Sequence, residues 1–231
     1  MLLFSCGKES TCFKSTGDIV QEKREISTSV TSIVTEDNID IVITQSSEAS
    51  LIVEGGGNLL PYINTDVSGA VLSISSDNKC GMFRDNTIPI TVYLSIPNLS
   101  KIDYTGQGVI TNTGLLDLER LDIESFGGSG SIYLNMNVDE FTVGQHSGPA
   151  DFRFSGLARD ARVYTLGSGW FHLEDFLVQT MHVNHSGIGD VFVNVKDRLS
   201  VELRSRGSVF YFGDPLVVIQ PHVGSGNVIQ K

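Results

Sequence analysis

A short motif recurs seven times between Tyr104 and Lys231, and its regular spacing constrains the fold more than any other feature of the chain. Each copy has a small residue, any residue and a second small residue, followed by alternating apolar residues. From one second small residue to the next, the steps are 22, 20, 19, 20, 18 and 19 residues. A repeat of this size is typical of a solenoid, because each unit is too small to bury its own apolar face and must stack on its neighbours. The copies are Gly106–Gly108, Gly128–Gly130, Gly148–Ala150, Gly167–Gly169, Gly187–Gly189, Ser205–Gly207 and Gly224–Gly226.

The residues after each motif alternate in polarity, which predicts a strand. Two positions after the second small residue every copy is apolar, and four positions after it only Asn112 and Gln230, in the end copies, are polar. A second strand is predicted before each motif, as at Leu121 and Ile123. We therefore expect an all-β fold in which residues 99–231 form a parallel β-helix-like solenoid of about seven rungs of about 20 residues. Each rung would contain a strand, a glycine-rich corner, a second strand and a short turn.

The glycines of the motif have a structural explanation. A sharp corner requires backbone angles or close approaches that a Cβ atom hinders, and small residues let neighbouring rungs come together there. A phosphate-binding loop would instead need a strand, one glycine-rich turn and then a helix. No long helical pattern follows any copy, so the motif predicts corners.

Residues 17–98 also have strand patterns but lack the regular glycine spacing. Alternation at 38–45 predicts a strand, residues 90–94 resume the strand pattern, and 67–74 predicts a hairpin or a bend in a strand. We interpret this β-rich N-terminal portion either as a cap, which would cover the strands at the solenoid end, or as an irregular first part of the same solenoid. In the second case residues 17–231 would be one continuous domain.

The first 16 residues predict export and a tether. Leu3-Phe4-Ser5-Cys6 resembles a bacterial lipobox, in which a signal peptidase cuts before a cysteine that then carries lipid. We assign residues 1–16 to the remnant of a lipoprotein signal and a polar tether, with Cys6 as the lipidation site. The alternative is an ordinary cysteine in an apolar N-terminus. Cys12 and Cys80 would remain for a disulfide in an oxidising compartment, or as free thiols.

The overall charge narrows the classes of partner. The chain has 16 Lys and Arg against 27 Asp and Glu, a net charge of −11. Nucleic acids and anionic membrane surfaces are bound through basic patches, so neither is an expected partner. No run of eighteen apolar residues occurs, and membrane contact is expected only through the lipid anchor.

The order of these parts resembles a family of Bacteroidetes envelope proteins, the putative auto-transporter adhesin, head GIN domain family (domain of unknown function 2807). The resemblance rests on Asn38-Ile39-Asp40-Ile41, Ile96-Pro97-Asn98-Leu99 and the corner Tyr104–Gly108 with its downstream repeats, and covers about residues 25–231. Asn-Ile-Asp stands where the family name has Gly-Ile-Asn. The resemblance implies a small exported or lipid-anchored protein with a right-handed β-helix-like fold in the envelope of a Gram-negative bacterium, and it implies no catalytic residues.

Two sets of polar residues bear on metal binding and catalysis. Asp151 and Asp190 directly follow the second small residue, as in calcium-binding repeats, but only two of seven copies have Asp there and calcium needs six or more oxygen ligands. His146, His185 and His222 stand four residues before the second small residue, about 9 to 10 Å from one another, and predict part-buried histidines in one column. No GxSxG elbow or cleft-spanning carboxylate pair is evident. The sequence predicts no metal, no cofactor and no catalytic residue.

The outward positions predict an apolar ridge. If the second and fourth positions after the motif face inward, the third position faces out, and it is aromatic or apolar in several copies. Such a ridge would either bind an extended glycan or peptide, or be covered by the N-terminal portion or a partner subunit. The candidate binding residues are Tyr133, Arg153, Trp170, His172, Phe192 and Phe210.

We therefore expect a non-catalytic, lipid-anchored envelope protein that acts as an adhesin-like binding module for a glycan or protein partner. Two alternatives remain open: a carbohydrate-active enzyme, either a lyase or a glycosidase, on a β-helix, and a purely structural subunit of an oligomer. A cluster of acidic side chains with Arg or Lys beside the ridge would favour the enzyme. A buried ridge would favour the structural subunit.

Overall fold

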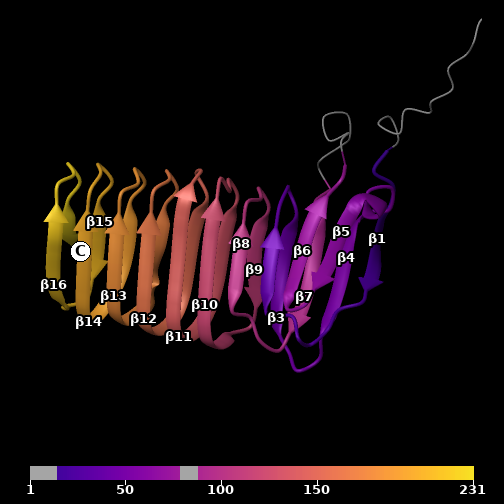
Figure 1. Cartoon of the computed structure of the whole chain (residues 1–231), viewed down its shortest axis with the longest axis horizontal. Coiled ribbons are helices and arrows are strands. Elements are labelled where there is room, and N and C mark those ends of the chain that lie inside the picture. Colours follow the sequence, from indigo (N-terminus) through magenta and orange to yellow (C-terminus); the bar gives the residue numbers. More distant parts are fainter. Residues whose placement is uncertain (1–14, 79–87) are drawn as a thin grey trace, which may run out of the picture.

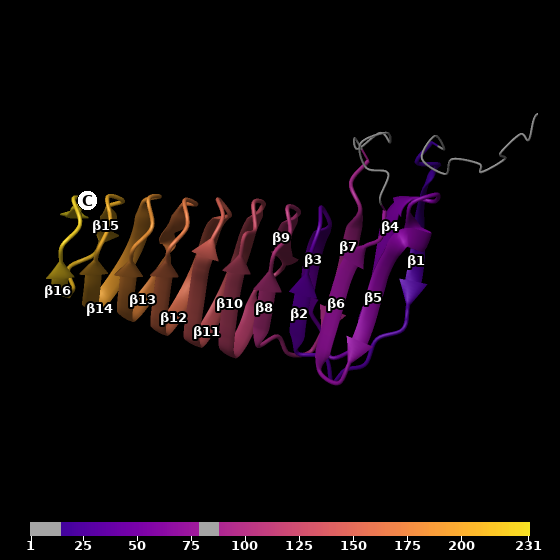
Figure 2. The same cartoon turned by 45° about the horizontal axis from the view of Figure 1, so that its top comes forward.

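The computed structural model describes residues 15–78 and 88–231, which form a single stack of β-strands (Figures 1 and 2). The predicted β-solenoid is confirmed. One short 3-10 helix, η2 (Leu60–Tyr62), interrupts the strands, and no helix in the described ranges has the length and apolarity needed to cross a bilayer. Cys6, Cys12, Cys80 and most of the predicted tether lie outside the described residues.

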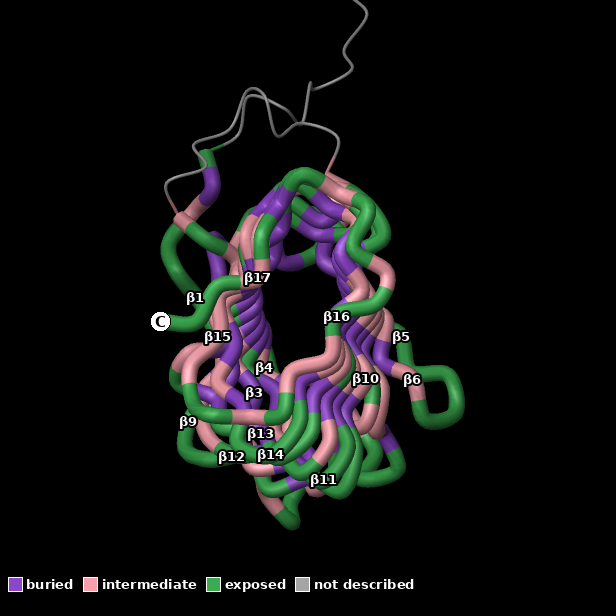
Figure 3. Tube along the Cα trace, turned by 90° about the vertical axis from the view of Figure 1, so that its left-hand side faces the viewer, coloured by how far each residue is buried: buried purple, intermediate pink, exposed green. Residues whose placement is uncertain are grey.

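Two long walls enclose the core, as the view along the solenoid shows (Figure 3). Wall A consists, in spatial order, of β5 (Ile63–Ser68), β6 (Val71–Ser76), β2 (Ser32–Thr35), β8 (Lys101–Tyr104), β10 (Leu116–Phe126), the second halves of β11 (Ser131–Ser147), β12 (Asp151–Thr165), β13 (Phe171–His185) and β14 (Val191–Leu203), and β16 (Leu216–His222). Wall B consists of β1 (Ile19–Arg24), β4 (Ser50–Gly56), β7 (Thr91–Ile96), β3 (Asp40–Gln45), β9 (Val109–Thr113), the first halves of β11 to β14, β15 (Val209–Phe212) and β17 (Val228–Gln230).

The register of the strands follows the repeat spacing. On wall B, the residues two positions after each motif pair directly from rung to rung, and all but Val228 are buried. The same column continues into the N-terminal portion, where Ile41 pairs with both Ile110 and Val92. This column is Ile110, Ile132, Phe152, Phe171, Val191, Val209 and Val228.

The predicted short turn between rungs is wrong for the middle of the solenoid. β11 to β14 are 13 to 17 residues long because each bends from wall B to wall A without leaving the sheet. Leu118, Val138, Ala158 and Val178 are paired through this bend, so ladder hydrogen bonds continue where a turn would break them. The bends form a narrow third side of the solenoid, which we call the bridge side.

The N-terminal portion is interleaved with the repeats. β2 lies between β6 and β8, and β3 lies between β7 and β9, so residues 32–45 form a rung of the same stack. The end of the stack is antiparallel: β4 pairs with β1 and β7, and β5 and β6 form a hairpin around Gly69, whose φ is +61°. The hairpin predicted within 67–74 therefore starts earlier, at Ile63.

Aromatic side chains fill the middle of the core. Phe154 from wall B meets Phe141 from wall A edge-on, with 4.9 Å between ring centroids. Phe176 from the bridge side packs edge-on against Phe141 at 5.5 Å, and Phe152 stacks on Phe171 at 4.6 Å. All five rings are buried, so this cluster joins the three sides of the solenoid.

Candidate ligand-binding surfaces

The outer ridge predicted from the sequence lies along the outside of wall B. Tyr133 pairs with Arg153, Arg153 with His172, His172 with Phe192, and Phe192 with Phe210, so these five residues form one column. The sixth residue, Trp170, directly precedes β13 and stands two residues before His172. Its ring nevertheless stacks against the rings of His172 and Phe192, with centroid distances of 6.1 and 6.2 Å. The structure thus brings all six candidate residues onto one surface.

The rings within the ridge differ in what they offer a ligand. His172, Phe192 and Phe210 stack face to face at 5.3 and 4.9 Å and are half-buried, so much of each ring face is covered by its neighbour. The Lys231 ammonium lies 4.7 Å from the Phe210 ring centroid. Tyr133 and Trp170 remain 42% and 45% exposed. The accessible aromatic surface of the ridge is therefore concentrated at Tyr133 and Trp170, with Arg153 exposed between their rungs.

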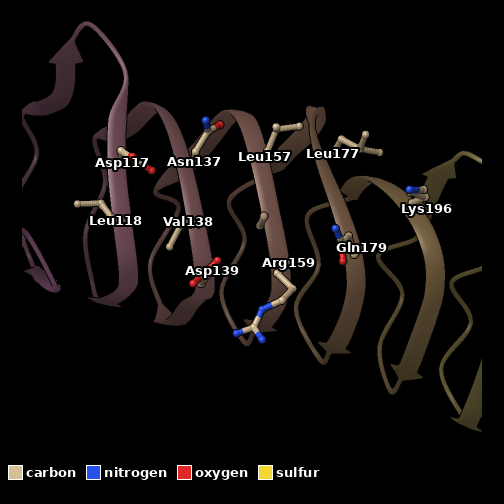
Figure 4. Close-up of a pocket in the computed structure, with 11 residues that line it drawn as sticks. Asp117, Leu118, Asn137, Val138, Asp139, Leu157, Arg159, Leu177, Gln179 and Lys196 are labelled. Atoms are coloured by element: carbon tan, nitrogen blue, oxygen red, sulfur yellow. The ribbon is translucent and has the colours of Figure 1, made fainter.

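A second candidate surface is a groove of about 350 Å³ on the bridge side (Figure 4). Its floor is formed by Leu118, Val138 and Ala158, which pair across successive rungs and are almost fully buried. Asp117, Asn137, Leu157 and Leu177, which pair across successive rungs, form one rim, and Lys196 from β14 closes its far end. Asp139, Arg159 and Gln179 form the other rim. We call this surface the bridge groove.

The bridge groove was missed by repeat alignment for a physical reason. Leu157 stands seven residues after Ala150, whereas Leu177 stands eight residues after Gly169, because β13 has a register shift opposite Arg153 and Ser155. Counting from the motif therefore separates two leucines that are neighbours in space. The sequence did contain one signal for the groove. Leu157 and Leu177 each stand in a stretch whose polar residues predict exposure, so two leucines on the surface could have been expected.

The aspartates that resemble calcium ligands have a structural role. The Asp151 carboxylate accepts a hydrogen bond from the Trp170 backbone N–H at 2.8 Å, and Asp190 accepts one from Ser208 N–H at 2.8 Å. Asp40 accepts the Val109 N–H in the same way at 2.7 Å. Each carboxylate thus links its rung to the next. Across the described ranges, no three His, Cys, Asp or Glu side chains lie close enough to share a metal ion.

The predicted column of part-buried histidines is wrong for His146, whereas His185 and His222 share a column through Leu203. In the observed register Tyr104 pairs with Ser125, Ser125 with Gln145 and Gln145 with Thr165, so His146 is not in this column. The reason is that the corners after Ser125 and Gln145 contain one residue more than the corner after Tyr104. His146 consequently lies outside, where its ring stacks on Phe126 at 4.2 Å and its Nε2 is 2.6 Å from Glu124. His222 is also exposed. Among the three histidines, only His185 is buried.

The true inward column at this corner is polar as far as His185, which pairs with the buried Leu203 of the next rung. It contains Thr35, Tyr104, Ser125, Gln145, Thr165 and His185, all buried. Tyr104 donates to the Gly108 carbonyl at 2.7 Å, and Gln145 Nε2 donates to the Ala150 carbonyl at 2.7 Å. Burial raises the pKa of Tyr104 to about 12. Tyr104 and Gln145 thus satisfy carbonyl groups where the backbone turns away from the ladder.

His185 makes stability depend on pH. Burial lowers its pKa, opposed by the Asp190 carboxylate and the Gly189 carbonyl, and its Nδ1 is hydrogen-bonded to Thr165 Oγ1. The unfolded chain therefore takes up a proton before the folded chain does, so the free energy of unfolding should fall as the pH drops below about 6.5. Urea unfolding between about pH 5 and pH 7 measures the slope. His185→Leu, which copies Leu203 in the next rung, should reduce that slope, and an unchanged slope would contradict the assignment.

Comparison with known proteins agrees with this geometry. The family model described as putative auto-transporter adhesin, head GIN domain matches residues 30–215. The chain belongs to this family. The matched residues include the interleaved rung of β2 and β3 as well as the first six glycine corners, so the head GIN domain here is not confined to the repetitive half of the chain.

Solved structures share the fold of this head GIN domain. A putative adhesin from Bacteroides fragilis has a TM-score of 0.84 at 20% identity, covering 94% of this chain and 100% of that chain. A putative adhesin from Parabacteroides distasonis has a TM-score of 0.70 at 20% identity, covering 94% and 99%. A putative lipid binding protein from Parabacteroides distasonis has 0.64 at 20% identity, covering 94% and 100%. No curated protein matches the sequence. At these identities the likeness establishes the fold.

Proposed function

We propose that this head GIN domain is a non-catalytic, adhesin-like module of the cell envelope that binds an extended glycan or protein segment along the outer ridge. The observation that carries the proposal is the row of rings on wall B, in which Tyr133 and Trp170 are 42% and 45% exposed. Large exposed apolar surfaces are uncommon on proteins without a partner. Family membership and the shared fold with putative adhesins support an adhesin-like role.

The shape of the ridge suits an elongated ligand. Tyr133 and Trp170 are two rungs apart, which is about 10 Å along the solenoid. Arg153 stands between them and can donate several hydrogen bonds to hydroxyl, carboxylate or carbonyl oxygens. A chain-like ligand lying parallel to the solenoid axis would contact all three, with Phe192 and Phe210 extending the apolar surface.

Trp170 is the only tryptophan and therefore reports directly on the ridge. Titration with soluble envelope polysaccharides and with extended peptides should shift or quench its fluorescence when a ligand covers the ring. Tyr133→Ala should weaken binding about tenfold, because a ring contact is worth about 1 to 2 kcal/mol. Tyr164→Ala is the matched control, since Tyr164 is also exposed but lies on wall A. Equal effects of the two substitutions would contradict the ridge as the binding site.

A buried ridge would have favoured the structural-subunit alternative, and the exposed rings favour binding instead. The enzyme alternative calls for a cluster of acidic side chains with Arg or Lys beside the ridge. The acidic side chains there have other partners: Asp151 holds the Trp170 N–H, and Glu174 lies 3.2 Å from His172. Ridge variants should accordingly change ligand affinity, and incubation with the bound polysaccharide should leave its chain length unchanged.

We also propose that Cys6 carries the lipid that anchors the protein in the envelope. The support is the Leu3-Phe4-Ser5-Cys6 pattern together with the adhesin family, which fits an envelope location. Metabolic labelling with a fatty acid should label the wild-type protein, and Cys6→Ala should abolish the label and release the protein from the membrane fraction. Cys12→Ala is the matched control and should keep the label. A label that persists in Cys6→Ala would contradict the lipidation proposal, whereas the proposal that the outer ridge binds a ligand would still stand.

A further inference from the structure

We propose that the bridge groove is a second binding site, which takes an extended segment of a partner protein with a basic side chain at one end, two apolar side chains in the middle and an acidic side chain at the other end. The groove lies on the bridge side and contains none of the outer-ridge residues. The inference therefore stands independently of ligand binding by Tyr133 and Trp170.

The charges at the two ends of the groove are opposite and unpaired. Asp117 and Asp139 lie at the β10 and β11 end, and Lys196 lies at the β14 end (Figure 4). Within the described residues, none of these three side chains takes part in an ion pair or hydrogen bond; Asp117 is held through its backbone by Gln45. Arg159, by contrast, is ion-paired with Glu140 at 3.8 Å and with Asp160 at 3.5 Å. The groove thus presents a negative end and a positive end that are both free to pair with a ligand.

The middle of the groove is apolar. Leu157 and Leu177 are paired on adjacent rungs and are 53% and 38% exposed. They stand beside Ala158, which lies between Leu157 and Arg159 in the floor of the groove. Covering two leucines and this floor removes apolar surface from water, which favours a ligand with apolar side chains at the corresponding points.

The spacing of the groove matches an extended peptide. From Asp117 to Lys196 the rim crosses five rungs, or about 19 Å at 4.8 Å per rung. In an extended chain, alternate residues face one side at intervals of about 6.6 Å, so positions one, three, five and seven span about 20 Å. A segment of the form Lys-x-Leu-x-Leu-x-Glu therefore places its cation over Asp117 and Asp139, its leucines over the middle and its carboxylate beside Lys196.

Other ligand classes fit this surface less well. An acyl chain would have to cover unpaired carboxylates at one end of the groove, at a cost in desolvation. No aromatic side chain lines the groove in the described residues, so ring stacking on a sugar has no donor there. A peptide satisfies both charges and the apolar centre at once. Complementary charges at the two ends also fix which side chain lies where, so they contribute selectivity.

The test is fluorescence anisotropy at low salt with a labelled heptapeptide, Lys-Ser-Leu-Thr-Leu-Ser-Glu, and the folded wild-type protein. Comparison peptides have Lys at both ends, Glu at both ends, or Ser in place of both leucines. Each wrong charge should weaken binding about two- to fivefold, as expected for exposed ion pairs. Removing the leucines should weaken binding about tenfold or more. Leu157→Ser in the protein should have a comparable effect.

A charge swap gives the sharpest readout. Lys196→Glu should reverse the preference, so that the peptide with Lys at both ends binds better than the original one. Lys23→Glu makes the same change in net charge on β1 and should leave the preference as in wild type. Absence of binding below about 1 mM, or an unchanged preference in Lys196→Glu, would overturn the proposal. Loss of peptide binding in Trp170→Ala with retention in Leu157→Ser would also overturn it, because the peptide would then occupy the ridge.

Discussion

Gly169→Ala is expected to lower the free energy of unfolding by about 3 kcal/mol or more, the largest loss we anticipate from adding one methyl group. A Cβ at Gly169 would overlap the carbonyl oxygen of Ala150 in the preceding rung and approach the Gln145 side chain. The obstacle is backbone, which cannot rotate away as the end of a flexible side chain could. Relief would require the two rungs to separate at the corner, where the Ser168 N–H bonds to the Gly148 carbonyl.

Gly57→Ala is the matched control for this experiment. Its added Cβ would lie 3.4 Å from the nearest atom, a methyl group of Val20, which is an ordinary contact. We expect a change within about 0.5 kcal/mol. Urea unfolding monitored by Trp170 fluorescence and by circular dichroism measures both variants. Similar stabilities for the two alanine variants would contradict the view that the corner glycines are required by the close approach of rungs.

Phe154→Ala is expected to cost about 3 to 5 kcal/mol, as for other fully buried aromatic side chains. Phe154 is completely buried and touches Phe141 of wall A and Phe176 of the bridge side. Removing its ring would leave a cavity where the three sides of the solenoid meet, and the surrounding rungs are held too firmly by their ladders to close it. The same unfolding measurements apply, with hydrogen exchange along β11 to β13 to locate the loosened rungs.

Two further substitutions separate burial from ring chemistry at this point. Phe126→Ala removes a ring that is 52% exposed and should cost less than about 1 kcal/mol. Phe154→Leu keeps most of the volume and should cost less than about 1.5 kcal/mol. If Phe126→Ala were as destabilising as Phe154→Ala, then the aromatic cluster would not be the centre of the core.

Much of the solenoid could be predicted from the sequence because its repeats are local. The spacing of the glycine corners sets which residues pair on wall B, and the column from Ile110 to Val228 follows directly. The outward positions follow from the same alternation, which is why Tyr133, Arg153 and Phe192 share a surface. The repeat spacing and the alternation of polarity are enough to predict the pairing and the facing of residues wherever each rung has the same number of residues between corner and strand.

The wrong predictions occur where the number of residues between corner and strand changes from one rung to the next. One extra residue in the corners after Ser125 and Gln145 moves His146 from the core to the surface. A register shift in β13 hides the alignment of Leu157 with Leu177, and with it the bridge groove. The continuous bends of β11 to β14 also could not be predicted, because a bent strand and a short turn have the same apolar pattern.

The interleaved rung has a consequence for how the chain acquires its structure. Ser32 pairs with Val71 and with Lys101, so β2 finds its partners only 39 and 69 residues later. In a chain that emerges in order from a ribosome, this segment therefore stays unpaired until β6 and β8 have appeared, while the repeats from β10 onward can add one after another. Long-range closure of this kind is slow, and unpaired strands are prone to join other chains in the meantime. Formation of this rung should thus be the slow step of folding, since each later repeat pairs with its immediate neighbour in the chain.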